Sequence, residues 1–197
     1  EFAQVPPELQ YLHIAVGLVF LYARELERAE RAAEHAVRAL GLRDGIAFPQ
    51  LIASTDGAVS VVEVAARIPG GQMADLVRHA VGVDLVEIAL LQALGEPVPD
   101  ALVTPAFQQP LAIRFLTAEP GPLATGIVKR IGALDPVLAA EGVVQADTYL
   151  RIGETIRPVQ VDGDRRGYVI AIADTSVEAL ARADAAAVQL QVEIEVG

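Results

Sequence analysis

An Asp-Gly dipeptide between two β-rich runs constrains the fold of this chain more than any other feature. Asp56 and Gly57 interrupt residues 48–72, which read FPQLIASTDGAVSVVEVAARIPGGQ. Asp-Gly is typical of a two-residue hairpin turn, because both turn positions need a positive φ angle. Counting outward from Thr55 opposite Ala58 predicts the register of an antiparallel hairpin. The predicted pairs are Ile52 with Val61, Gln50 with Glu63, and Phe48 with Ala65.

The second strand of this hairpin brings charged side chains to one face. Because side chains alternate across a sheet, Glu63 and Arg67 share a face, and Gln50 lies opposite Glu63. Glu63 interrupts an otherwise apolar strand, where an unpaired buried charge is unfavourable. Carboxylate and carboxamide oxygens suit a hard cation such as Mg²⁺, which takes phosphate oxygens as further ligands. We therefore predict Gln50 and Glu63 as metal ligands and Arg67 as a phosphate contact; a plain Glu63–Arg67 ion pair is the open alternative.

Two adjacent glycines follow this strand. Gly70 and Gly71 allow the backbone to approach a ligand closely, and a helix is predicted directly after them, over residues 73–80. The N-terminus of that helix favours an anion. The pattern adds a second element, next to the charged face of the hairpin, that suits a phosphate.

The rest of the chain alternates helices with short strands. Apolar residues at three- and four-residue steps predict a helix over residues 24–40, and Asp84 is predicted to cap a helix over 85–94 that Gly95 ends. Strands are predicted over 111–117, 126–131, 143–152 and 167–173, followed by a helix with a Thr175–Glu178 capping box and a strand over 191–196. Prolines between residues 97 and 110 indicate a boundary near Pro105. We expect an α+β fold with domains at residues 1–104 and 105–197.

Composition excludes several classes of function. The 197 residues carry 15 Lys+Arg and 26 Asp+Glu, a formal net charge of -11, which disfavours a nucleic-acid surface. The absence of cysteine excludes disulfides and thiolate catalysis and favours a cytoplasmic location. The apolar run 14–23 is too short to span a membrane. The chain begins at Glu1 and its only methionine is Met73, so we expect it to be part of a longer protein.

The stretch from residue 30 to 97 resembles the C-terminal lobe of the ATP-grasp fold, an antiparallel sheet with flanking helices. The resemblance rests on the run ALGLRDGIAFPQLIASTDGAVSVVEVAARIPGG at 39–71, on GVDL at 82–85 and on ALG at 93–95. It is most similar to the L-amino-acid ligase and biotin-carboxylase-like branch. A weaker match over residues 165–183 agrees with the small C-terminal α+β subdomain of those ligases.

This resemblance implies ATP-dependent joining of a carboxylate to an amine through an acyl phosphate, with amino acids or peptides as substrates. It implies that Glu63 bridges Mg²⁺ ions on the ATP phosphates, that Gln50 adds a ligand, and that Arg67 stabilises the transferring phosphoryl group. Gly70 and Gly71 are the implied nucleotide contacts. The implied partners are small carboxylate and amine substrates and the missing N-terminal lobe of the parent chain, with no nucleic acid or membrane; a homodimer is left open.

Two departures from the family pattern matter. Ala65 stands where the family usually has Asn, which removes one metal-coordinating oxygen. Lys129 is the sole lysine, whereas the other ATP-grasp lobe supplies lysines for the phosphates. We therefore expect a C-terminal fragment of a ligase that is inactive alone. The alternatives are a non-catalytic interaction or dimerisation module derived from an ATP-grasp protein, and part of a biotin-dependent carboxylase.

Overall fold

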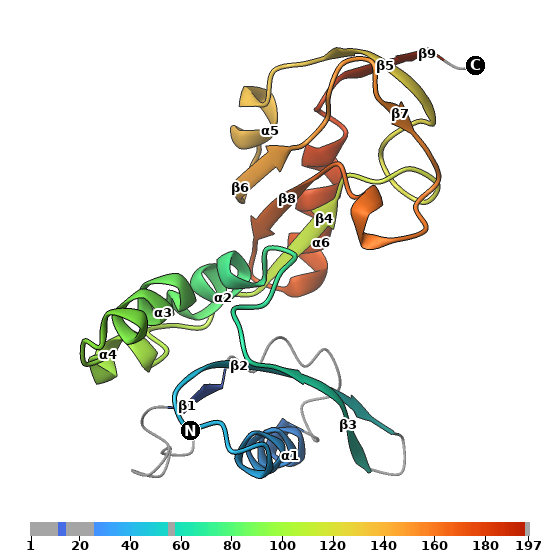
Figure 1. Cartoon of the computed structure of the whole chain (residues 1–197). Helices are drawn as coiled ribbons and strands as arrows, with labels where there is room; N and C mark the ends of the chain where they lie inside the picture. The colour runs from blue at the N-terminus through green and yellow to red at the C-terminus, as the bar shows by residue number, and fades with distance from the viewer. Residues whose placement is uncertain (1–11, 15–25, 55–57, 196–197) are drawn as a thin grey trace. The chain divides into compact units, whose positions relative to one another are not determined.

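The computed structural model describes residues 12–14, 26–54 and 58–195 (Figure 1). The chain divides between Phe107 and Gln108 into two compact units. Both units combine helices with mainly antiparallel strands, which confirms the predicted α+β class. No helix within the described residues is long and apolar enough to cross a membrane.

The first unit contains a three-stranded sheet with the order β1–β2–β3. Its strands are β1 (Leu12–Ile14), β2 (Gly45–Ala53) and β3 (Val59–Ala65). β1 runs parallel to β2, and β3 runs antiparallel to it. The predicted pairs Phe48–Ala65 and Gln50–Glu63 are confirmed, so the pattern located this end of the hairpin correctly.

The register differs from the prediction nearer the turn. Ile52 pairs with Ser60 rather than with Val61. The register shifts after Gln50, and Val62 is the extra residue of a bulge on β3. The predicted Ile52–Val61 pair is therefore wrong, because alternation alone does not reveal where a strand carries an extra residue. Thr55 and the Asp-Gly turn lie outside the described residues.

The two faces of β2 pack against different helices. Ala47 packs with Val37 of α1 (Leu26–Ala39), whereas Ile46 packs with Leu85 and Ile88 of α3 (Leu85–Leu94). Consecutive residues of a strand point to opposite faces, so this alternation alone places α1 and α3 on opposite sides of the strand. α1 ends one residue earlier than predicted, and residues 24 and 25 of the predicted helix lie outside the described residues. The remaining helices of this unit are α2 (Met73–Val81) and α4 (Asp100–Val103), of which the short α4 was not predicted.

The predicted caps at both ends of α3 are confirmed. The carboxylate of Asp84 accepts hydrogen bonds from the backbone N–H groups of Val86 at 2.9 Å and Glu87 at 3.1 Å. α3 then ends at Gly95, which adopts the left-handed conformation. The bounds of α3 match the prediction because both ends are set by residues within the helix's own neighbourhood.

The second unit holds two three-stranded antiparallel sheets, ordered β4–β8–β6 and β7–β5–β9. The strands of the first are β4 (Leu111–Phe115), β6 (Val143–Thr148) and β8 (Gly167–Ile172). Those of the second are β5 (Gly126–Ile131), β7 (Thr155–Ile156) and β9 (Val192–Glu195). Its helices are α5 (Asp135–Leu138), α6 (Ser176–Ala187) and the single 3₁₀ turn η2 (Asp162–Asp164). The bounds of β5 match the prediction, whereas the short α5 and β7 were not predicted.

Helix α6 packs against the β4–β8–β6 sheet through small side chains. Ala183, Ala186 and Ala187 are buried and share a core cluster with Val169 and Ala171 of β8. Alanines allow the helix to approach the sheet closely. One of the two hydrogen bonds of the predicted capping box is confirmed: the Thr175 hydroxyl accepts from the Glu178 N–H at 3.2 Å. The Glu178 carboxylate accepts instead from Arg182, at 2.8 Å.

Candidate functional site

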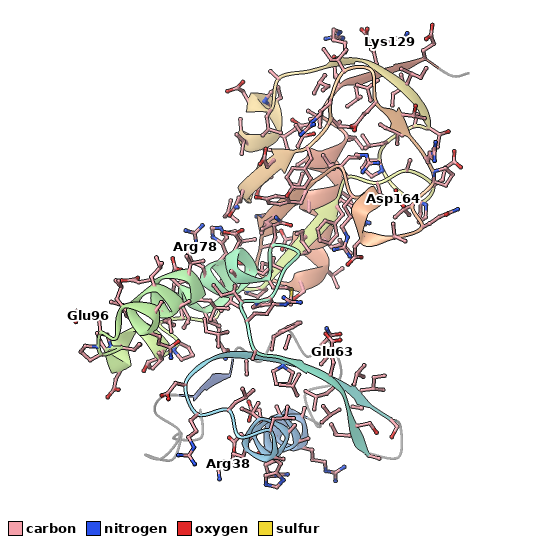
Figure 2. All side chains as sticks on the ribbon, in the orientation of Figure 1. Arg38, Glu63, Arg78, Glu96, Lys129 and Asp164 are labelled. Atoms are coloured by element: carbon pink, nitrogen blue, oxygen red, sulfur yellow. The ribbon has the colours of Figure 1, made fainter. Side chains whose placement is uncertain are left out.

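The predicted metal ligands meet across the hairpin of the first unit. Gln50 on β2 and Glu63 on β3 are register partners, and Gln50 Nε2 donates to Glu63 Oε1 at 2.6 Å. Figure 2 shows the Glu63 side chain projecting from β3. An ionised carboxylate only accepts hydrogen bonds, so the amide nitrogen and not the amide oxygen must face it.

Both side chains of this pair are exposed. The expectation of a buried carboxylate on β3 is therefore wrong: residues 60–63 are all exposed, and the apolar side chains of Val61 and Val62 face solvent with Glu63. Glu63 needs no counter-ion to offset a loss of hydration. Its second oxygen has no hydrogen-bond partner among the described residues, so it is available to a ligand.

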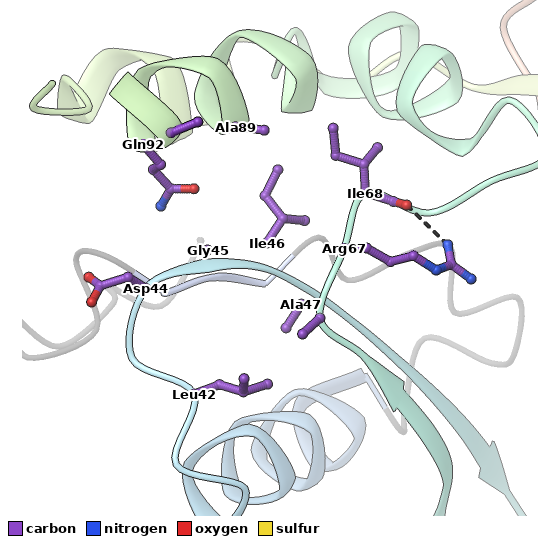
Figure 3. Close-up of a pocket in the computed structure, with 11 residues that line it drawn as sticks. Leu42, Asp44, Gly45, Ile46, Ala47, Arg67, Ile68, Ala89 and Gln92 are labelled. Carbon is purple, nitrogen blue, oxygen red and sulfur yellow. Dashed lines mark hydrogen bonds between the residues drawn. The ribbon is translucent and has the colours of Figure 1, made fainter. Parts of the chain in front are cut away.

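We expected Arg67 to share a strand face with Glu63, and the structure does not place it there. β3 ends at Ala65, and Arg67 Nη1 donates to the carbonyl oxygen of its neighbour Ile68 at 3.0 Å. Figure 3 shows the guanidinium held by this hydrogen bond. Within the described part of the chain, Arg67 and Glu63 form no ion pair, so the ion-pair alternative is not observed. Arg67 is exposed and uses one of its five N–H donors in this bond, which leaves others for an anion.

Gly70 and Gly71 differ in backbone conformation, and only Gly71 has a left-handed one. Gly71 has φ +67°, and Gln72 after it has φ 63°, so the chain turns through left-handed conformations into α2. Gly70 has no such requirement, and a Cβ built on it meets no atom within 4 Å. Space is open beside the backbone of Gly70, as close approach of a ligand would need.

The N-terminus of α2 presents a mixed electrostatic environment. No side chain caps it, so its first N–H groups are not occupied by a capping group. Asp75 lies in the first turn and would repel an anion, but its carboxylate is 3.3 Å from Arg78 Nη2. The carboxylate of Asp75 and the guanidinium of Arg78 together add no net charge that would favour an anion at this end of the helix.

The hairpin carries two side chains with oxygen atoms of the kind that bind Mg²⁺. Glu63 supplies a carboxylate and Gln50 a carboxamide next to it, and Ala65 adds no ligand. No group of three or more His, Cys, Asp or Glu side chains that could hold a metal occurs among the described residues. Mg²⁺ is commonly held by one or two carboxylates together with substrate phosphates, so these two residues fit as the protein's share of such a site.

The structure also shows a cavity that the sequence did not predict. It has a volume of about 350 Å³ and lies between the start of β2, the chain after β3 and one face of α3. Ile46, Ile68 and Ala89 contribute to its apolar wall, and Asp44 and Gln92 also line it (Figure 3). These residues come from three separate segments, so no local spacing signals that they meet.

Comparison with known proteins identifies the fold. Residues 114–195 match the family model of L-amino acid ligase C-terminal domain 2. The L-amino acid ligase of Bacillus licheniformis superimposes with a TM-score of 0.72 at 21% identity, over 91% of this chain and 45% of that one. The fold is that of the ATP-grasp carboxyl-terminal region.

Two further ATP-grasp structures show the same fold. The phosphoribosylglycinamide synthetase of Anaerococcus prevotii matches with a TM-score of 0.73 at 16% identity, over 90% of this chain and 44% of that one. A biotin carboxylase from Campylobacter jejuni matches with a TM-score of 0.62 at 15% identity, over 90% of this chain and 38% of that one. The chain thus spans less than half the length of these ATP-grasp relatives. No match was found among curated proteins.

Proposed function

We propose that the chain is the carboxyl-terminal part of an ATP-dependent ligase that joins a carboxylate to an amine. The observation that carries this proposal is the Gln50–Glu63 pair, placed side by side on the hairpin of an ATP-grasp fold. The match of residues 114–195 to an L-amino acid ligase domain supports amino acids or peptides as the substrates. We assign residues 1–104 to the ATP-grasp domain and 105–197 to a small subdomain.

Glu63 and Gln50 are the proposed protein ligands of Mg²⁺. The free oxygen of Glu63 would bind the cation directly, and Gln50 would add its carboxamide oxygen. Since Gln50 Nε2 faces Glu63 in the structure, its amide must turn over before its oxygen can take part. Bound Mg²⁺ would neutralise charge on the ATP phosphates, whose oxygens complete its coordination.

Arg67 and the glycines are the proposed contacts of the reacting groups. The substrate carboxylate attacks the γ-phosphorus of ATP, which releases ADP and forms an acyl phosphate. The amine nitrogen then attacks the acyl carbon, which releases phosphate and a proton. The unused N–H donors of Arg67 would stabilise charge on the transferring phosphoryl group, and the open backbone at Gly70 would allow the nucleotide to approach. No covalent intermediate with the protein is required.

The nucleotide site is completed, in this proposal, by an N-terminal lobe that supplies lysines for the phosphates, since Lys129 is the only lysine of this chain. The 197-residue chain alone is then expected to bind MgATP weakly or not at all. Titration calorimetry of MgATP into the chain tests this, and micromolar affinity would contradict it. The cytoplasmic location and a homodimer stay predictions.

The decisive experiment uses the enzyme that contains this chain together with its ATP-binding lobe. We expect Glu63→Gln to abolish amine-dependent ADP release without unfolding the protein, because a neutral amide cannot replace the carboxylate ligand. Glu96→Gln, at an exposed position that follows α3, is the matched control and should leave the rate unchanged. Unchanged turnover in Glu63→Gln would refute the metal assignment.

A further inference from the structure

Helix α3 is apolar around its whole circumference. Its sequence, LVEIALLQAL, contains a single charged residue, Glu87, and a single uncharged polar residue, Gln92. A surface helix of a globular protein usually carries charged and polar residues on the side that faces water, whereas a helix that is apolar all round is typical of one that is buried. The composition of α3 therefore predicts that its whole surface is covered.

The fold covers one face of this helix. Leu85 and Ile88 are buried and share a core cluster with Ile46 of β2. Figure 3 shows Gln92 directed from α3 toward β2 on the same side. The apolar residues of this face are thus explained by the core of the first unit.

A row of large aliphatic side chains on the opposite face is exposed. Val86, Leu90 and Leu94 are 47%, 59% and 75% exposed. Since an α-helix turns by about 100° per residue, Leu90 lies about 160° around the axis from Ile88, and the three side chains form an i, i+4, i+8 ridge about 12 Å long. We call these three residues the α3 ridge. Ridges with this spacing pack into the grooves of a second helix, so the shape of the exposed face suits a helical partner.

The charged residues of this part of the chain are all acidic. Residues 80–113 contain four carboxylates and no Lys, Arg or His. Glu87 borders the α3 ridge next to Val86, is exposed, and takes part in no ion pair within the described part of the chain. A partner with Lys or Arg beside its apolar residues complements these charges, whereas a second copy of this face would bring like charges together, which is unfavourable.

We propose that the α3 ridge docks a basic amphipathic helix, whose apolar residues pack on Val86, Leu90 and Leu94 and whose Lys or Arg side chains lie beside Glu87. Recognition of this kind uses apolar anchors of the partner at i, i+3 or i+4, and i+7. α3 is about three turns long, so a partner of three to four turns can cover the ridge. This proposal does not depend on the proposed ligase activity, because it involves neither nucleotide nor Mg²⁺.

Two peptides that differ only in charge test the proposal on the 197-residue chain. Each is a synthetic helix of about 14 residues, roughly four turns, with leucines on one face and either lysines or glutamates on the other. Binding is followed by amide chemical shifts in NMR. We expect saturable shifts centred on α3 for the lysine peptide, and binding of the glutamate peptide at least about tenfold weaker. Equal binding of the two peptides, shifts not centred on α3, or self-association of the free chain through α3 would overturn the proposal.

Two variants locate the docking site. Leu90→Gln is expected to weaken binding of the lysine peptide by about tenfold, because an apolar contact is lost. Glu87→Gln is expected to weaken it by about threefold, the effect of losing one exposed ion pair. Both residues are exposed, so neither change disturbs the core.

Two controls make the same chemical changes in the second unit. Val177→Gln alters a side chain that is 82% exposed on α6, and Asp174→Asn alters an exposed carboxylate just before that helix. Both variants should bind the lysine peptide like the parent chain. Unchanged affinity in Leu90→Gln, or an equal loss in Val177→Gln, would refute the site. An equal loss in Glu87→Gln and Asp174→Asn would show attraction to the net charge of the chain rather than docking on α3.

Discussion

Gln50 and Glu63 lie opposite each other on β2 and β3, with Gln50 Nε2 2.6 Å from Glu63 Oε1. The bulge at Val62 decides this pairing. Nearer the turn Ile52 pairs with Ser60, and that register, continued without a bulge, would place Gln50 opposite Val62. Bulges often re-aim side chains next to functional sites, and here the extra residue brings the carboxylate beside the amide.

The Gln50–Glu63 hydrogen bond should contribute little to stability. Both side chains are exposed, so water replaces the bond when it is lost. We expect Gln50→Leu to lower the free energy of unfolding by less than about 1 kcal/mol in urea denaturation. Ile88→Ala, in the core, should lower it by about 2–5 kcal/mol in the same assay. A loss in Gln50→Leu as large as that of Ile88→Ala would show that the pair is structural.

The two adjacent glycines should respond differently to alanine. Gly71 has φ +67°, so Gly71→Ala should lower the unfolding free energy by about 1–2 kcal/mol. Gly70 has open space at its Cβ and no left-handed backbone, so Gly70→Ala should leave stability unchanged or raise it by up to about 1 kcal/mol. Thermal and urea unfolding of both variants measure this. Equal losses would mean that the turn does not need Gly71 specifically.

Acid should weaken the loop that Asp164 holds. Asp164 Oδ2 accepts from the backbone N–H groups of Gln160 at 2.9 Å and Val161 at 3.0 Å, and these bonds, with the charges of Arg166 and Arg157, lower the pKa of the carboxyl below its ordinary value of 3.8. A lowered pKa in the folded state stabilises the protein above the unfolded pKa, and this stabilisation is lost as the pH falls through the folded pKa.

Asp164→Asn tests this pH dependence. We expect the variant to be less stable than the parent chain at about pH 6, and the difference to be smaller at an acidic pH below the folded pKa of Asp164, where the parent carboxyl is itself protonated. Urea unfolding at the two pH values measures it, and Asp162→Asn in the same loop is the control. A difference that is the same at both pH values would contradict the assignment.

The close contact of α6 with its sheet should not tolerate larger side chains. Ala183 is fully buried, so Ala183→Leu should lower the unfolding free energy by about 1–3 kcal/mol through overpacking. Ala181 is exposed on the same helix, so Ala181→Leu should change it by less than about 0.5 kcal/mol. Urea denaturation measures both variants. Equal changes in unfolding free energy for Ala183→Leu and Ala181→Leu would show that the helix can shift away from the sheet.

Local signals predicted the elements whose ends depend on neighbouring residues. The Asp84 cap and Gly95 bound α3, and the pattern around β5 placed that strand at Gly126–Ile131. Very short elements such as α4 and β7 were missed, because four or two residues carry too little periodicity to be recognised. The prediction continued β3 to Arg67, two residues too far. The alternation of side chains continues beyond Ala65, where pairing with β2 stops.

The sequence alone determined the class of the fold and the caps of α3, because each depends on alternation or on capping groups close together in the chain. The pairing of Gln50 with Glu63 agrees with the predicted register, but the bulge at Val62 that produces it was not predicted. Only the tertiary structure decided that Glu63 is exposed, that Arg67 turns to Ile68, and that Asp44 and Gln92 line one cavity. Those features depend on which faces of β2 and α3 pack together. Packing between distant segments leaves no signal in the local spacing of residues.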